Sequence, residues 1–459
     1  MKARGMMQSI AWAVAALVAL PVIAYLALLG INRHDEPPSA DAEQLVAMKR
    51  DRPLLADAAN GYIHALGMAA GTDVDPVALG GARNAYIETF VSTSAADGNP
   101  SLPGRNVDYR AARSPGVVAL AAACREDDRA CAKALDADPG ALAQWLASEQ
   151  WLLDRYRRML ATVAWREAIP GDANAPLADY LHALEGQKLH LLAAWQSAQA
   201  RDPAAVRDLL EQDLVFWREV LVSSELLISK MVAVAAARRN FAFGNLALRE
   251  LPQELANAAV PPSWRQPLTL AERSLARVLG GEWQVIAASL RMVMAPEAQA
   301  GSARGLAERL QRPLFQEQAT LNLFAARLVE LGAMSELPYP DVAQALDGLP
   351  GQHDKSLPRL RPYNLAGSAL VSMEPPGYVN YIARTADLEG ERRALLLAAT
   401  LRGAGTQRDD MAAAVRDASL RSPYDQAPFE WDADSGAVVF SGLGTRLSTP
   451  RTAWRIAVH

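Results

Sequence analysis

An uncharged apolar run near the N-terminus is the longest feature of the hydropathy pattern. It extends from Ser9 to Ile31 and follows Lys2 and Arg4. About 20 helical residues, each rising about 1.5 Å, cross a hydrocarbon core of about 30 Å. A cleavable signal peptide has a shorter apolar region and then a small-residue cleavage site, and no convincing site follows this run. The pattern therefore predicts an uncleaved transmembrane anchor over 9–31.

Charges on the two flanks of this run predict its orientation. Lys2 and Arg4 should stay in the cytoplasm, whereas the outer flank, 32–36, is mixed in sign. Charged residues interrupt the best candidate for a second span, 214–237. We therefore expect a cytoplasmic stretch over 1–8, one span, and the remaining chain outside the inner membrane. The alanine- and arginine-rich composition is typical of a high-GC bacterium, in which that outer compartment is the periplasm.

Beyond the anchor, apolar residues recur at three- and four-residue spacing, which is typical of amphipathic helices. Aspartate followed by proline caps and opens a helix, and this pair occurs at residues 75, 138 and 202. Thr269 and Glu272 form a capping box that should open a helix towards Met294. We expect further helices over 141–168, 177–199, 204–248 (one or two helices) and from Glu317 to a C-cap at Gly332.

Proline, glycine and β-branched residues divide the rest of the chain. A turn triplet at 434–436 lies between two short β-rich runs and predicts a hairpin, to which 454–458 could add a third strand. The expected fold class is mostly α, an irregular helical bundle or α-solenoid after one transmembrane helix, with a small C-terminal β-hairpin. The expected segments are a spacer over 32–40, a helical domain over 41–336, a Pro-rich connector over 337–362, helices over 363–421 and a β tail over 422–459.

Cys124 and Cys131 are the two cysteines of the chain. One continuous helix would hold their Cα atoms roughly 10 Å apart, beyond the ~7 Å that a disulfide allows. Asp127 or Asp128 can cap a new helix between them, so the sequence favours a helix break and a structural disulfide. Free thiols are an alternative. A redox pair or metal site is a weaker one, because there is no C-x-x-C motif and no neighbouring histidine.

Composition and motifs narrow the function only by exclusion. Lys+Arg number 46 and Asp+Glu 51, a net charge of -5, which disfavours nucleic acid as a partner. The chain has no G-x-S-x-G, Walker A, H-E-x-x-H or Rossmann fingerprint. We therefore expect no cofactor, and the question of catalysis stays open, with the motifs leaning towards a non-enzymatic protein.

Two groups of polar residues are weak candidates for chemistry. His182 and Glu185 share a helix face and could contribute to a metal site, but His190 is two turns from His182, so other helices would have to supply ligands. The alternative is a solvated helix face. Lys230 lies in the most apolar part of the body, where burial could lower its pKa for use as a base or nucleophile. Its alternative is a lysine that extends to solvent or pairs with a carboxylate.

Two further sets of residues have a structural and a functional interpretation. Gln318 and Asn322 are one turn apart and could satisfy buried backbone groups, which we favour, or line a pocket. Seven tryptophans on predicted helices could line a glycan groove, but such residues are more often part of the core. The tryptophans are Trp145, Trp151, Trp165, Trp195, Trp217, Trp264 and Trp283.

Several short motifs accompany the anchor and the cysteine pair. They are Asn60-Gly61-Tyr62 with Leu66-Gly67, Lys230-Met231, and a tail with Pro423-Tyr424-Asp425 and Pro428-Phe429. Together these features resemble a group of uncharacterised proteobacterial proteins that are single-pass, membrane-anchored and mostly helical in the periplasm. The resemblance implies a fold and a location and no activity.

The sequence therefore predicts a membrane-anchored periplasmic protein that binds or scaffolds envelope partners. The expected partners are the inner membrane, through the N-terminal helix, and an envelope protein. One alternative is a periplasmic hydrolase, acting on cell-wall glycan through Asp and Glu in a helical groove. Another is a lipid- or small-molecule-binding protein.

Overall fold

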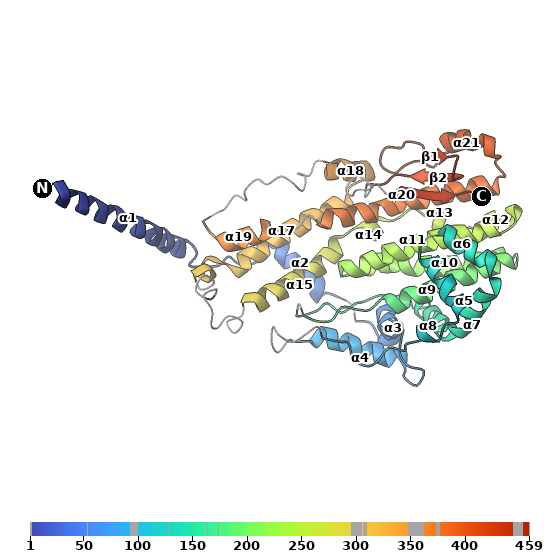
Figure 1. Ribbon diagram of the computed structural model, residues 1–459, viewed down its shortest axis with the longest axis horizontal. Coiled ribbons are helices and arrows are strands. Elements are labelled where there is room, and N and C mark those ends of the chain that lie inside the picture. Colours follow the sequence, from blue (N-terminus) through green and yellow to red (C-terminus); the bar gives the residue numbers. More distant parts are fainter. Residues whose placement is uncertain are drawn as a thin grey trace.

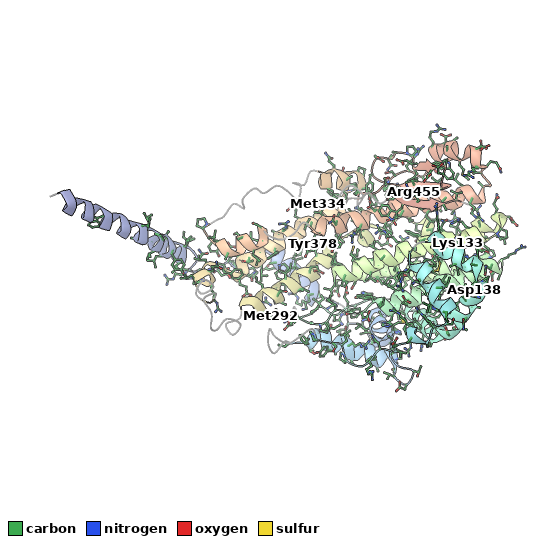
Figure 2. All side chains as sticks on the ribbon, in the orientation of Figure 1. Lys133, Asp138, Met292, Met334, Tyr378 and Arg455 are labelled. Carbon is green, nitrogen blue, oxygen red and sulfur yellow. A yellow bond between two sulfur atoms is a disulfide. The ribbon has the colours of Figure 1, made fainter. Side chains whose placement is uncertain are left out.

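The computed structural model describes residues 2–52, 54–91, 100–126, 128–162, 164–172, 174–294, 305, 310–347, 362–372, 377–443 and 453–458. Helix α1 (Lys2–Ile31) projects from one end of an elongated helical body (Figure 1). Met292 lies in the half of the body nearer α1, and Asp138 lies at the opposite end (Figure 2). Within the described residues, no helix combines the length and hydropathy expected of a membrane span. Many side chains of 1–18 lie outside the description, so the anchor over 9–31 stays a prediction.

The described helices of the body follow one another with short connections. They are α2 (Ala40–Arg50), α3 (Gly61–Gly67), α4 (Pro76–Thr89), α5 (Pro115–Glu126), α6 (Asp128–Ala137), α7 (Pro139–Ser148), α8 (Gln150–Leu160), α9 (Leu181–Gln199), α10 (Pro203–Ser223), α11 (Leu227–Glu250), α12 (Gln253–Ala259), α13 (Pro262–Arg265), α14 (Leu270–Arg273), α15 (Ala276–Met294), α17 (Glu317–Glu336), α18 (Tyr339–Asp347), α19 (Leu365–Ser372), α20 (Gly377–Gly403) and α21 (Met411–Asp417).

Long helices form the centre of the body. Helices α9, α10 and α11 pack on one another, and α20 lies along α11 (Figure 1). One apolar core fills the space among α3, α8, α9, α10 and α11, and a second lies among α2, α15, α17, α20 and the C-terminal sheet. The mostly helical fold expected from the sequence is confirmed.

The C-terminal sheet has three antiparallel strands in the order β1 (Glu430–Asp432), β2 (Ala437–Phe440) and β3 (Trp454–Ala457). Trp431 pairs with Val438, and Val438 pairs with Ile456. The predicted hairpin is therefore extended by the third strand. The sheet packs on α20, where a Cβ added at Gly390 would lie 2.0 Å from Phe440 Cζ, so the aromatic ring occupies the space that glycine leaves.

Tertiary contacts alter several predicted helix boundaries. The aspartate–proline pairs open α4, α7 and α10 as expected, with each aspartate accepting a hydrogen bond from the first turn. The helix expected over 141–168 is wrong beyond residue 160, and it is divided at Glu149. The helix expected from 177 begins at Leu181. In the irregular stretch between, Asn60 bridges to Ala164, so the backbone there satisfies its hydrogen bonds through α3 and not within a helix.

Two further predictions around α17 need correction. Gly332 does not end a helix, because α17 continues to Glu336; a Cβ at Gly332 would lie 3.2 Å from Ala276 Cα, so this glycine serves close helix packing. The connector over 337–362 is not irregular throughout, since α18 occupies 339–347 and buries Val342 and Leu346. Residues 348–361 of that connector lie outside the described residues.

Cys124 and Cys131 form the disulfide, with Cα atoms 4.2 Å apart. The helix breaks between α5 and α6, as the spacing requires, and both sulfurs lie in the apolar core. The pair therefore joins two short helices at the end of the body far from α1 (Figure 1).

Replacing both cysteines by serine should lower the free energy of unfolding by about 2–3 kcal/mol, since the closed loop is short. Guanidinium unfolding of the two proteins measures the difference. Reductant should shift the native protein by a similar amount and leave the variant unchanged. A variant as stable as the native protein would contradict a structural role.

The predicted spacer over 32–40 is bound to the helical body. The Asp35 carboxylate accepts hydrogen bonds from the backbone N–H of Gln318 (2.7 Å) and Ala319 (2.9 Å), in the first turn of α17. The Asn322 side chain accepts from Ser39 N–H at 2.9 Å and donates to the Pro37 carbonyl at 2.9 Å. Asn322 thus satisfies backbone groups, as we expected.

Buried Asn32 extends these contacts to the start of α19. Its amide donates to the Pro362 carbonyl at 2.9 Å, and its side-chain oxygen accepts from Asn364 N–H at 2.6 Å. The Gln316 amide donates to the Asn32 carbonyl at 2.6 Å. We call the contacts of 32–39 with 316–322 and 362–364 the joint. Because each contact fixes a backbone group, the joint sets the direction in which α1 leaves the body.

Candidate ligand groove

The largest cavity in the described part of the chain is a groove of about 780 Å³ beside α4 and the segment that precedes α9. Its walls mix exposed apolar side chains with hydrogen-bonding groups, which is typical of a surface that orients a ligand. The residues that matter here are Arg83, Leu102, Asn106, Leu177 and Asp179.

A chain of polar contacts fixes one wall of this groove. Arg83, on α4, donates to the Leu66 carbonyl at 2.6 Å and to Asn106 Oδ1 at 2.9 Å. Asn106 Nδ2 lies 3.5 Å from Asp179 Oδ2, and His182 Nδ1 lies 3.3 Å from the same oxygen. Hydrogen bonding by His182 lowers the pKa of Asp179. The wall thus presents an ionised carboxylate held in place by its neighbours.

An ion cluster continues from this wall along α9. Arg113 makes two hydrogen bonds to Glu149, at 2.6 and 2.9 Å, and a third to Glu185 at 3.2 Å. Lys188 Nζ lies 3.8 Å from Glu185. Burial raises the pKa of Glu185, but Lys188, Arg113 and Arg110 outweigh burial, so the net shift is downward. Glu185 is therefore an ionised partner in a network and is unsuited to donate a proton.

The structure separates the three candidates on α9. His182 and Glu185 both lie on the side of α9 that faces 106–113, with the His182 ring 5.9 Å from the Tyr109 ring. His190 lies in the core, where its Nε2 hydrogen-bonds with the Leu209 carbonyl at 2.9 Å. Burial lowers the pKa of His190 to about 4, so the ring is neutral. Among the described residues, no group of three His, Cys, Asp or Glu side chains could hold a metal ion.

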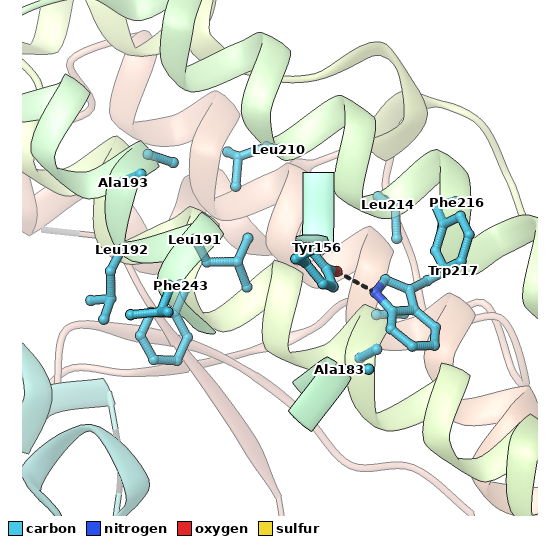
Figure 3. Close-up of a cluster of buried hydrophobic side chains, with 14 of the residues drawn as sticks. Tyr156, Ala183, Leu191, Leu192, Ala193, Leu210, Leu214, Phe216, Trp217 and Phe243 are labelled. Atoms are coloured by element: carbon cyan, nitrogen blue, oxygen red, sulfur yellow. Dashed lines mark hydrogen bonds between the residues drawn. The ribbon is translucent and has the colours of Figure 1, made fainter. Parts of the chain in front are cut away.

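Asp213 on α10 is the centre of a buried hydrogen-bond network. Tyr156 Oη donates to one carboxylate oxygen, while Gln187 Nε2 (3.1 Å) and Asn240 Nδ2 (3.0 Å) donate to the other. Trp217 Nε1 in turn donates to Tyr156 Oη at 2.8 Å (Figure 3). Burial raises the pKa of Asp213 to about 6 against the opposing effect of these donors. The network connects α8, α9, α10 and α11 within the core.

Glu167 is a second buried carboxyl with a structural task. It accepts hydrogen bonds from the backbone N–H of Glu225 and from Leu226 N–H at 2.9 Å, just before α11 begins. Ser229 Oγ donates to its other oxygen. Burial raises the pKa of Glu167 to about 7. A side chain distant in sequence thus caps α11, which has no local capping residue.

Lys230 is fully buried, and its ammonium donates to the Leu221 carbonyl. The expectation that it extends to solvent or pairs with a carboxylate is therefore wrong, because a backbone carbonyl supplies its partner. Burial lowers the pKa of Lys230 to about 7. Lys230 does not line any of the larger cavities described, so its position supports a packing role.

Lys230→Met should stabilise the protein below pH 7 by about 1–2 kcal/mol, since it removes a buried charge. The folded-state pKa lies below the usual 10.5, so the cost of Lys230 is complete below pH 7 and disappears as pH approaches 10.5. The advantage of methionine should shrink over that range in urea unfolding at several pH values. Exposed Lys133→Met is the control, and a pH-independent difference at position 230 would contradict the account.

The tryptophans are core residues and do not line the groove. Trp145, Trp195, Trp217 and Trp264 are essentially inaccessible, Trp165 and Trp283 are 4% exposed, and Trp151 packs partly buried against Tyr109. The groove residues Arg83, Asn106 and Asp179 were not predicted. Asp179 carries a local signal, because it accepts from Leu181 N–H at the start of α9, but the two others do not.

Comparisons with known proteins give no family for this chain. No protein-family model, no curated protein and no solved structure matches it. The function must therefore be argued from the geometry alone.

Proposed function

We propose that the chain is a periplasmic binding or scaffolding protein, held at the inner membrane by α1. The joint carries this proposal. A flexible tether would need no contacts after residue 31, yet backbone groups over 32–39 are hydrogen-bonded to α17 and to the segment before α19. An arrangement of this kind holds a body at a fixed angle to its anchor, which matters when a partner must be met at a defined height above a bilayer.

The groove supplies the partner surface in this proposal. Leu177 is 62% exposed at the groove, beside the charged wall of Asp179 and Asn106. An exposed apolar side chain rimmed by polar groups is typical of a protein interaction site. A short segment of an envelope protein could place an apolar side chain against Leu177 and a donor against Asp179.

Site-specific photocross-linking in intact cells tests this proposal. A photoreactive residue at Leu177 should give one discrete adduct. The same residue at Leu270, which is 50% exposed on α14 away from the groove, should not. Adducts of equal pattern at both positions, or none at 177, would contradict a partner in the groove.

The hydrolase alternative requires a carboxyl of raised pKa facing a groove beside a second carboxylate. Glu149 and Glu185 are the nearest pair of this kind that we find beside the groove wall, and Arg113 binds both. This engagement favours the binding proposal over the hydrolase.

The small-molecule alternative has its own support in a cavity of about 280 Å³ between α11, α20 and β3. Phe241, Leu395 and Trp454 give it apolar walls, and the ion pair of Arg238 with Glu391 lies at its side. Burial raises the pKa of Glu391 to about 7. Quenching of tryptophan fluorescence by a brominated fatty acid, lost in Leu395→Trp because the cavity is filled, would favour this alternative.

A further inference from the structure

A second cavity, of about 390 Å³, lies between the end of α2, the start of α15 and the residues around Glu225. Three cationic side chains line it, Lys49, Arg52 and Arg277, together with the carboxylates of Glu225 and Asp51. The geometry points to a binding site for a small dianion of the phosphate class in this cavity. The site is separate from the groove and does not depend on the proposed function.

The carboxylates of the cavity are already engaged. Arg52, whose side chain is 6% exposed, forms an ion pair with Glu225 and donates to the Glu167 carbonyl. Asp51 is paired with Arg50 at 2.8 Å. The charges of these two carboxylates are thus matched by cations of their own.

Lys49 and Arg277 are the cations that remain. Within the described residues, neither side chain makes a hydrogen bond or a close ion pair, although Lys49 also feels the more distant charges of Glu88 and Glu225. Burial and the neighbouring Arg52 lower the pKa of Lys49. Two positive charges held near a third without partners cost free energy that a bound dianion would recover.

Close helix packing holds Arg277 at this cavity. A Cβ at Gly281 would lie 1.6 Å from the Glu225 carbonyl oxygen, so α15 approaches that backbone as only glycine allows. Arg277 lies one turn earlier on the same face of α15, in its first turn, where a cation is unfavourable beside the helix dipole. An anion in the cavity would offset that effect too.

The test is calorimetric titration of inorganic phosphate into the full chain in a neutral detergent, with chloride at equal ionic strength as the reference. Lys49→Met with Arg277→Met should weaken phosphate binding about tenfold or more, since two charge-assisted contacts are lost. Arg158→Met with Arg265→Met removes two exposed cations elsewhere and should bind phosphate as the native chain does. Absence of phosphate-specific binding by the native chain, or equal binding by the cavity variant, would overturn the site.

The same titration in lipid nanodiscs separates two sources of phosphate. If the cavity takes a lipid headgroup, phosphatidic acid in the nanodisc should compete and weaken binding of free phosphate. If it takes a soluble anion, nanodiscs with and without phosphatidic acid should give equal affinities. Both results require the cavity and support it; loss of all binding in nanodiscs of phosphatidylcholine alone would contradict it.

Discussion

Asp213→Ala should lower the free energy of unfolding by about 3–5 kcal/mol, because it leaves buried donors without their acceptor and a void beside them. Tyr156 Oη loses its acceptor while Trp217 Nε1 still donates to it. Gln187 and Asn240 each retain one backbone carbonyl, those of Ala236 and Leu210. The residual hydrogen bonds keep the loss within this range and prevent complete unfolding.

Asp213→Asn separates hydrogen bonding from volume. Its amide keeps the shape but must direct N–H groups at Tyr156 or at the pair of Gln187 and Asn240, so about 2 kcal/mol should still be lost. Asp208→Ala, on the same helix with its carboxylate at the surface, should change stability by less than about 0.5 kcal/mol. Guanidinium unfolding measures all three, and an asparagine variant as stable as the native protein would contradict the network account.

Gly281→Ala is the second substitution with a large expected effect. The added Cβ would lie 1.6 Å from a backbone oxygen, that of Glu225, which cannot rotate away as a side chain could. Helix α15 must therefore move from the start of α11, where Glu282 accepts from Leu227 N–H at 2.9 Å. We expect a loss of about 3 kcal/mol or more.

The neighbouring glycine is a matched control for this prediction. A Cβ at Gly280 would lie 3.2 Å from Met48 Sδ, at the far end of a flexible side chain. Alanine also has the higher helix propensity, by about 1 kcal/mol, so Gly280→Ala should leave stability within about 1 kcal/mol of the native value. Thermal unfolding of the pair checks this contrast, and equal losses at both positions would show that helix propensity or general crowding decides the outcome.

The sequence predicts those elements whose signals are local. Aspartate–proline pairs, the Thr269 capping box and the cysteine spacing each depend on residues within one turn or two, and the structure confirms them. The boundaries it misses are decided by distant partners. Leu177 was expected in a helix, yet residues 162–180 are irregular and hydrogen-bond to α3, and Gly332 meets α15 where a C-cap was expected.

The candidate groove was accessible to sequence reasoning only in part. His182 and Glu185 share a face because helical spacing is regular, and both lie near the groove wall. Arg83 and Asn106 are far apart in sequence and carry no common motif, so only the packing of α4 against 100–106 brings them together. The cavity of Lys49, Arg52 and Arg277 is similar, since an unpaired cation is recognisable only when its surroundings are known.

A reporter fusion tests the central claim that α1 places the body in the periplasm. Alkaline phosphatase, which folds to its active form only in that oxidising compartment, is fused after His459 and assayed in intact cells. We predict full activity that remains with the membrane fraction after a high-salt wash. A fusion that is expressed at full length but silent, or that the wash releases, would contradict the anchored periplasmic account.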